Sequence, residues 1–232
     1  MLKIIKTLNI SRTIQPTNSE PTDIEPKVVA LTFDDGPNPY ATPQILDILK
    51  SENVKANFFM IGKWVKKYPE LARRIVSEGH NIGGHTYSHG GEDGRESWGD
   101  FKKGNDTIRE VTGVEVRQVR VPQFGYNEID TIDGKKVARI QELTEGSLAE
   151  DIASGKLSVI DCSINPNDWN VLVPSLLIKE YVLFRLHPGA IICLHDGSEK
   201  ESELKSRANR TVRMLPKLIQ DIKKKNYEFI VC

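Results

Sequence analysis

Short apolar runs alternate along the chain with longer segments in which apolar residues recur every three or four positions. The first run, Val28 to Phe33, is almost entirely apolar, which is typical of a strand buried on both faces. A helical pattern follows, with Thr42 expected at the N-cap and Pro43 in the first turn. Strands that alternate with helices predict βαβ units and a mostly parallel sheet. The pattern leaves two α/β architectures open, a closed barrel and an open, doubly wound sheet.

The same alternation continues to the end of the chain. Further helices are predicted at residues 69–78, 100–112, 174–186 and 208–224. Further strands are predicted at residues 57–61, 80–83, 116–121, 157–161, 190–194 and 227–231. Residues 1–26, by contrast, are rich in Thr, Ser, Pro and Glu without periodicity, which predicts a flexible N-terminal arm. We expect this arm to precede a single folded domain at residues 27–232.

Composition and charge disfavour several classes of partner. Lys plus Arg and Asp plus Glu both number 32, so no basic excess can neutralise a phosphate backbone, and we expect no nucleic acid partner. No apolar run approaches the 18 residues that an ordinary membrane span needs. Three cysteines predict free thiols in a reducing compartment rather than a disulfide framework.

The N-terminal residues lack the apolar run and cleavage site of a secretory signal. The chain is therefore expected to be soluble and, as it stands, cytoplasmic. A chain whose signal had been removed would look the same, which leaves an extracellular or cell-wall location open. Neither the compartment nor the oligomeric state is decided by these features.

Two acids and two histidines have the residue types and spacing of a metal site. Asp34 and Asp35 follow the first strand, where ligands gather in both architectures, and adjacent acids on a strand should point to opposite sides. His85 and His89 are four residues apart, which would place them on one side of a helical turn. Singly, these could be a plain turn and surface histidines. Together they match a common catalytic zinc set of two histidines and one carboxylate.

Two longer segments carry a family resemblance. Thr32 to Pro37 and Gly79 to His89 resemble the first two signature motifs of the polysaccharide deacetylases, the NodB homology domain of family 4 carbohydrate esterases. Weaker similarities follow in the family's order, at residues 120–122, 165–169 and 193–196. The resemblance runs from Lys27 to the end of the chain. It implies a single domain folded as a distorted (β/α) barrel.

The resemblance also implies a role for individual residues. The divalent metal, usually zinc with Co²⁺ and Ni²⁺ as alternatives, would be held by Asp35, His85 and His89. Asp34 would be the general base, and Arg120 would position it. His195 would be the general acid, and Asp168 would orient it. A small pocket for the acetyl methyl group would be formed by Trp169, Leu194 and Phe124.

Elementary chemistry agrees with these roles. A bound divalent ion lowers the pKa of water toward about 7 and polarises an amide carbonyl. Asp34 can accept a proton, and His195 can donate one to the departing amine near neutral pH. Asp168 would favour the imidazolium form of His195. Without the motifs, Arg120 and Asp168 could belong to ordinary surface ion pairs. Trp169 could be a core aromatic residue, and His195 could make a structural hydrogen bond.

The chain departs from the family pattern in four places. The third motif has one extra residue in the stretch Pro122 to Gly125, around Gln123 and Phe124, so its expected backbone contact to the substrate oxygen is in doubt. The segment at residues 131–155 is longer than usual, and it is either a surface excursion or, as a hypothesis, a lid near the site. Cys193 replaces a larger aliphatic residue, and Asn165 replaces an acid.

Three functions compete at this point. The first is removal of N-acetyl groups from N-acetylglucosamine in peptidoglycan or chitin-type oligosaccharides, with O-acetylated xylan as a weaker substrate candidate. The second is a catalytically silent carbohydrate-binding protein, and the third is a related hydrolase of small cyclic amides. The complete set of expected catalytic side chains favours the first.

Overall fold

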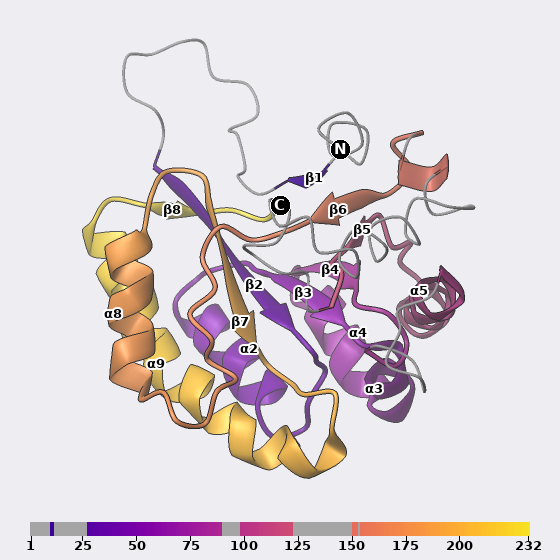
Figure 1. The fold of residues 1–232 in the computed structure, drawn as a ribbon, viewed down its shortest axis with the longest axis horizontal. Coiled ribbons are helices and arrows are strands. Elements are labelled where there is room, and N and C mark those ends of the chain that lie inside the picture. The colour runs from indigo at the N-terminus through magenta and orange to yellow at the C-terminus, as the bar shows by residue number, and fades with distance from the viewer. Residues whose placement is uncertain (1–9, 12–26, 90–97, 123–149, 153) are drawn as a thin grey trace, which may run out of the picture.

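A computed structural model of the protein describes residues 10–11, 27–89, 98–122, 150–152 and 154–232 (Figure 1). All of its paired strands run parallel, in the order β1-β6-β5-β4-β3-β2-β7, and β8 also pairs with β2. The strands are β1 Ile10–Ser11, β2 Val28–Asp34, β3 Asn57–Met60, β4 Asn81–Gly84, β5 Gln118–Val119, β6 Ser158–Ile160, β7 Ala190–His195 and β8 Glu228–Phe229.

The chain that follows β6 closes the sheet into a barrel. Ile164 forms a parallel bridge with Ile192 of β7, and the Ser163 N–H donates to the Ile191 carbonyl at 3.0 Å. The segment after β6 therefore pairs with β7, the strand at the opposite end of the sheet order. This decides between the two predicted architectures and confirms the distorted (β/α) barrel.

Helices cover the outside of this barrel, with α3, α4 and α5 along one side, α8 and α9 along the other, and α2 between α9 and α4 (Figure 1). Their bounds are α2 Thr42–Ser51, α3 Gly62–Lys67, α4 Pro69–Ser77, α5 Trp98–Thr112, α8 Ser175–Arg185, the 3-10 turn η1 Glu201–Glu203 and α9 Leu204–Lys224. Among the described helices, none has the length and apolar character needed to cross a membrane.

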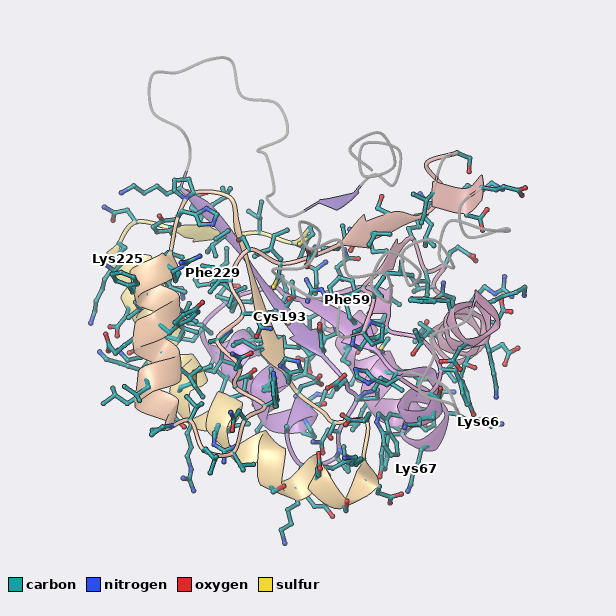
Figure 2. The ribbon with its side chains drawn as sticks, viewed as in Figure 1. Phe59, Lys66, Lys67, Cys193, Lys225 and Phe229 are labelled. Atoms are coloured by element: carbon teal, nitrogen blue, oxygen red, sulfur yellow. The ribbon has the colours of Figure 1, made fainter. Side chains whose placement is uncertain are left out.

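Strand alternation divides the core into an outer and an inner layer. Val29, Leu31 and Phe33 of β2 belong to the large cluster between strands and helices, whereas Val28 and Ala30 belong to a smaller cluster inside the barrel. Phe59 and Cys193 belong to the inner cluster and lie near the middle of the molecule, while Lys66 and Lys67 lie at its periphery (Figure 2). Strands β2, β3, β6 and β7 therefore each have one face that packs on helices and one that faces the barrel interior.

The amino end of the barrel is filled by the last residues of the chain. The carbonyl of Cys232 accepts hydrogen bonds from Asn81 Nδ2 and Gln118 Nε2, both at 2.8 Å, and its N–H donates to Asn57 Oδ1 at 3.0 Å. Ile230 and Cys232 pack against the inner cluster. Access to the barrel interior is consequently left to the carboxyl ends of the strands.

The structure corrects the predicted secondary structure in several details. Helix α3 has no counterpart in the prediction, and α9 begins at Leu204 rather than at residue 208. Thr42 is not an N-cap, because it is the first helical residue and its hydroxyl instead accepts the Asn38 N–H and donates to Asp196. Of the predicted arm, only Ile10 and Ser11 lie within the described residues, as strand β1. The flexibility of the arm stays a prediction.

His80 contributes pH dependence to the stability of the barrel. It is 7% exposed, its Nδ1 accepts the Ala56 N–H at 3.2 Å, and its ring meets Phe58 edge-on. Burial, aided by the charge of Lys55, lowers the pKa of His80 to about 4. The unfolded chain therefore binds a proton that the folded chain rejects between pH 6.5 and 4.

We accordingly expect the free energy of unfolding to decrease as the pH is lowered from 6.5 to 4. Up to about 3 kcal/mol of this decrease is attributable to His80. His80→Gln keeps a hydrogen-bond acceptor but cannot be protonated, so the loss between pH 6.5 and 4 should shrink. Urea unfolding at several pH values measures both slopes. Equal slopes in the two proteins would contradict the assignment.

Candidate active site

Asp35, His85 and His89 converge at the carboxyl end of the barrel. Asp35 follows β2, and His85 follows β4. Asp35 Oδ1 lies 3.4 Å from His85 Nε2 and 3.2 Å from His89 Nε2, and the ligand atoms of all three lie within 4.8 Å of one another. The structure thus brings together the three residues predicted to hold a metal.

The backbone reaches this arrangement by a route that the sequence pattern did not predict. Asp35 has a φ of 73°, so it leaves the strand geometry and its carboxylate turns toward the same site as that of Asp34. The expectation that these acids point to opposite sides is therefore wrong. The helical turn expected between His85 and His89 is also wrong, because Thr86 and His89 have φ values of 63° and 65°. Thr86 Oγ1 accepts the His89 N–H at 2.9 Å and stabilises this bend.

The cluster has the properties that a divalent cation requires. Asp35 is 3% exposed, and its Oδ1 accepts no hydrogen bond from the described residues although two imidazole nitrogens face it. Burial alone would raise the pKa of Asp35, but the neighbouring His89 and His85 hold it well below its usual value. His85 Nδ1 lies 2.8 Å from the Arg120 carbonyl, which can only accept, so its proton sits on Nδ1 and Nε2 is left as a ligand atom. These residues therefore fit a divalent metal.

Arg120 organises the groups on the inner side of this cluster. Its guanidinium is fully buried, and Nη1 donates to Asp34 Oδ1 at 2.8 Å and to Thr32 Oγ1 at 2.6 Å. Its remaining donors reach the carbonyls of Ile160 and Asp161 at 3.1 and 3.2 Å. The positive charge keeps a carboxylate at Asp34 compensated in an apolar interior. Asp34 Oδ2 meanwhile lies 4.0 Å from His85 Nε2, beside the cluster of Asp35, His85 and His89.

His195, at the end of β7, is oriented by Asp168. His195 Nδ1 lies 2.8 Å from Asp168 Oδ1, and the His195 N–H donates to Asp168 Oδ2 at 2.9 Å. Thr211 of α9 also donates its hydroxyl to this carboxylate. Burial would lower the pKa of His195, but the charge and hydrogen bond of Asp168 prevail and raise it to about 10. The imidazole is therefore biased toward its protonated form.

Comparison with known proteins assigns this arrangement to a family. The polysaccharide deacetylase family matches residues 22–136. A chitooligosaccharide deacetylase from Bradyrhizobium sp. (strain ANU 289) is 33% identical over 208 residues, which cover 86% of each chain. This chain belongs to the polysaccharide deacetylase family. The identification made from the sequence motifs is thereby confirmed.

Further relatives within the polysaccharide deacetylases extend the similarity to solved structures. A peptidoglycan-N-acetylglucosamine deacetylase from Bacillus cereus is 32% identical over 209 residues, which cover 88% of this chain and 85% of the relative. The crystal structure of the Bc1960 peptidoglycan N-acetylglucosamine deacetylase matches with a TM-score of 0.74 and 27% identity. That match covers 100% of this chain and 94% of the other.

The three residues predicted to form the pocket of this deacetylase have different outcomes. Trp169 is 40% exposed and adjoins Asp168, which binds His195. The prediction for Leu194 is wrong, because Leu194 is fully buried in the outer core cluster. Strand alternation explains this, since His195 and Cys193 take the inward positions of β7 and Leu194 the outward one. Phe124, Gln123 and most of the segment at 131–155 lie outside the described residues.

Sequence reasoning missed two hydrogen-bonding groups near the proposed catalytic residues. Cys193 Sγ lies 3.3 Å from Asp34 Oδ2, and the thiol can donate to that oxygen. Strand alternation would have placed Cys193 on the same face as His195. Thr211, which donates to Asp168, lies 43 residues further along the chain, so no local pattern could have identified it.

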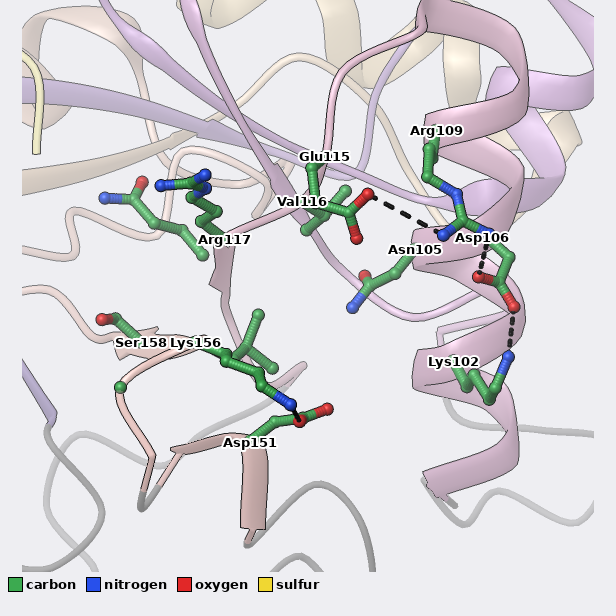
Figure 3. Close-up of a pocket in the computed structure, with 13 residues that line it drawn as sticks. Lys102, Asn105, Asp106, Arg109, Glu115, Val116, Arg117, Asp151, Lys156 and Ser158 are labelled. Atoms are coloured by element: carbon green, nitrogen blue, oxygen red, sulfur yellow. Dashed lines mark hydrogen bonds and ion pairs between the residues drawn. The ribbon is translucent and has the colours of Figure 1, made fainter.

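A separate cavity of about 730 Å³ lies between α5 and the first residues of β5 and β6 (Figure 3). Several of its charged side chains pair with one another, as Arg109 does with Asp106 and Glu115, and Lys156 with Asp151. Among the described residues, none of those predicted for the active site lines it. The cavity is therefore distinct from the Asp-His-His cluster.

The buried pair of Arg120 and Asp34 yields a stability prediction. Arg120→Met leaves the Asp34 carboxylate buried without its countercharge, so the free energy of unfolding should fall by about 3–5 kcal/mol. The matched control is Arg109→Met, because Arg109 pairs with Asp106 on the exposed side of α5. That change should cost at most about 1 kcal/mol. Urea unfolding of the two variants measures the difference, and similar losses would rule out a special role for the buried pair.

Proposed function

We propose that this chain is a metal-dependent hydrolase that removes N-acetyl groups from N-acetylglucosamine units of a polysaccharide or oligosaccharide. The observation that carries the proposal is the convergence of Asp35, His85 and His89 beside Asp34, in a member of the polysaccharide deacetylase family. His195 completes the set, since its ligand atom and that of Asp34 also lie within 4.8 Å of each other. A metal ligand set, a base and an acid are thus available at one mouth of the barrel.

Asp34 is proposed as the general base. When bound by Asp35, His85 and His89, a divalent ion, most readily zinc, would lower the pKa of water and polarise the amide carbonyl. Asp34 is ready to accept the proton of the attacking water, because Arg120 compensates its charge and fixes its orientation. Arg120 touches no reacting atom in this scheme and acts through Asp34.

His195 is proposed as the general acid. The departing sugar amine must be protonated as the C–N bond breaks, because its anion is too basic a leaving group. Asp168 holds the Nδ1 side of the imidazole, which leaves Nε2 to deliver the proton. Trp169, exposed beside Asp168, is proposed to contact the acyl group or the adjoining sugar.

Chitin-type and peptidoglycan glycans are the two substrate candidates. One relative is named as a chitooligosaccharide deacetylase and another as a peptidoglycan-N-acetylglucosamine deacetylase, and their identities to this chain are almost equal at 33% and 32%. Both contain the same N-acetylglucosamine unit, so the proposal names that unit rather than one polymer.

Acetate release tests the reaction class directly. Acetate should be released from N-acetylglucosamine oligomers or peptidoglycan, lost with a chelator and restored by zinc. Asp34→Asn removes the base and should lower the rate by about 100-fold or more. Asp47→Asn, a change of the same type on the exposed face of α2, should leave the rate unchanged.

Other outcomes of this experiment would support the competing functions. Saccharide binding without acetate release at any metal concentration would indicate a catalytically silent protein. Ring opening of small cyclic amides, with no acetate from glycans, would indicate the related hydrolase. Either result would overturn the deacetylase proposal.

The pH profile tests the role of Asp168. A general acid is lost as pH rises through its pKa, so the raised pKa of His195 moves the alkaline limb of kcat to higher pH. Asp168→Asn removes the charge that offsets burial, and the limb should move down by about 1–3 units. Thr211→Val removes only one hydrogen bond to Asp168 and should cause a smaller shift. An unmoved alkaline limb in Asp168→Asn would exclude His195 as the acid that the profile reports.

A further inference from the structure

The short helix α3 contacts the loop that joins the two proposed histidine ligands. The N–H groups of Gly62 and Lys63 donate to the carbonyls of Thr86 and Tyr87, both at 2.9 Å. These carbonyls belong to the bend between His85 and His89. Because the N–H groups of a helix's first turn have no partners within the helix, they are available to fix a neighbouring loop. The start of α3 therefore holds the backbone of the histidine loop in place.

The side chain of Lys63 extends this contact to a second loop. Its Nζ donates to the Ser88 carbonyl at 3.2 Å and to the Glu199 carbonyl at 2.7 Å. Ser88 directly precedes His89, and Glu199 lies four residues after His195. One ammonium group, with three N–H donors, thus joins the loop of the proposed metal ligands to the loop that follows the proposed acid.

Neighbouring contacts make both loops firm attachment points. Asp100 of α5 accepts the Ser88 N–H at 3.0 Å and the Ser88 hydroxyl at 2.9 Å. Trp64 Nε1 donates to the Ser198 carbonyl at 2.8 Å, next to the carbonyl that Lys63 binds. Of these contacts, only the Lys63 side chain spans the two loops.

The charge of Lys63 also interacts with that of Asp35, one of the proposed metal ligands. Burial lowers the pKa of Lys63, while the charges of Glu199, Asp35 and Asp100 act in the opposite direction. A cation beside a site for a divalent ion would repel that ion, so electrostatic assistance to metal binding does not explain its position. The hydrogen bonds of Lys63 to two backbone carbonyls explain its position, because they fix the geometry of both loops.

We propose that Lys63 is a positioning residue that holds the proposed metal ligands and the proposed general acid in register with each other. The inference rests on the proposed function and adds a residue to it. His89 has to stay within tenths of an ångström of a ligand position, and His195 has to reach the same substrate. His89 lies on a loop, and His195 is the last residue of β7, directly before the loop that carries Glu199. Lys63 ties these two loops together.

Substitution of Lys63 separates positioning from simple stabilisation. Lys63→Met keeps most of the length and the apolar stem but removes the side-chain donors, and it leaves the backbone N–H contact with Tyr87 in place. Lys63→Arg keeps a cation with several donors. Lys66→Met is the matched control, because Lys66 is exposed on the same helix and lies at the periphery in Figure 2. For each variant we would measure the zinc dissociation constant by competition with a chromophoric chelator, the melting temperature, and kcat and KM at saturating zinc.

The expected result is a loss in two independent measurements. Lys63→Met should weaken zinc binding about 10-fold and, with zinc saturating, lower kcat about 10-fold while KM changes less than about threefold. Lys63→Arg should recover most of both losses, and Lys66→Met should behave as wild type. A lower melting temperature with unchanged zinc affinity and kcat, or an arginine variant that rescues neither, would overturn the proposal.

The zinc measurement needs no substrate, so it separates the two proposals. If the wild-type protein binds zinc but releases no acetate, the deacetylase function fails. Weakened zinc binding in Lys63→Met would then still support Lys63 as the residue that positions the histidine loop. Equal zinc binding by Lys63→Met and wild type would reject that role regardless of activity.

Discussion

The pairing of Arg120 with Asp34 is the constraint on which the active end of the barrel depends. A guanidinium that is 2% exposed has to be compensated, and its donors reach Asp34 of β2 and the Ile160 carbonyl of β6. Its own backbone joins β4, because its N–H donates to Gly84 and its carbonyl accepts from His85. Misplacing this one residue would therefore disturb the proposed base, a proposed metal ligand and three strands together.

A second, separate network sets the proposed acid. The Asp168 carboxylate is hydrogen-bonded to His195 Nδ1 and accepts the His195 backbone N–H. The Thr211 hydroxyl of α9 donates to the same carboxylate from the helix layer. The two networks supply opposite countercharges: the Arg120 guanidinium pairs with the Asp34 carboxylate, and Asp168 favours an imidazolium at His195. Acid and base chemistry can then proceed at one pH because each group has its own countercharge.

The sequence predicted the buried strands and the ligand-bearing segments well, because long apolar runs such as Val28 to Phe33 and the two signature motifs are local features. The prediction from sequence failed where contacts between residues distant in the chain determine the structure. Helix α3 is six residues long and begins with glycine, so it has no helical periodicity to detect, and contacts with distant loops hold its start. Leu194 differs from its predicted place in the pocket because strand alternation turns it outward, away from the face of His195.

The placement of two adjacent carboxylates shows what this fold requires of its backbone. A regular strand would send Asp34 and Asp35 to opposite faces, and the left-handed φ of Asp35 prevents that, at a cost on the order of 1 kcal/mol that Asp tolerates better than most residues. The turn also needs room, since a Cβ at Gly197 would overlap the Asp35 carbonyl. Arg120 then pairs with one carboxylate and the histidines face the other. Two neighbouring residues can thus take distinct roles at one site because one φ angle and one glycine allow it.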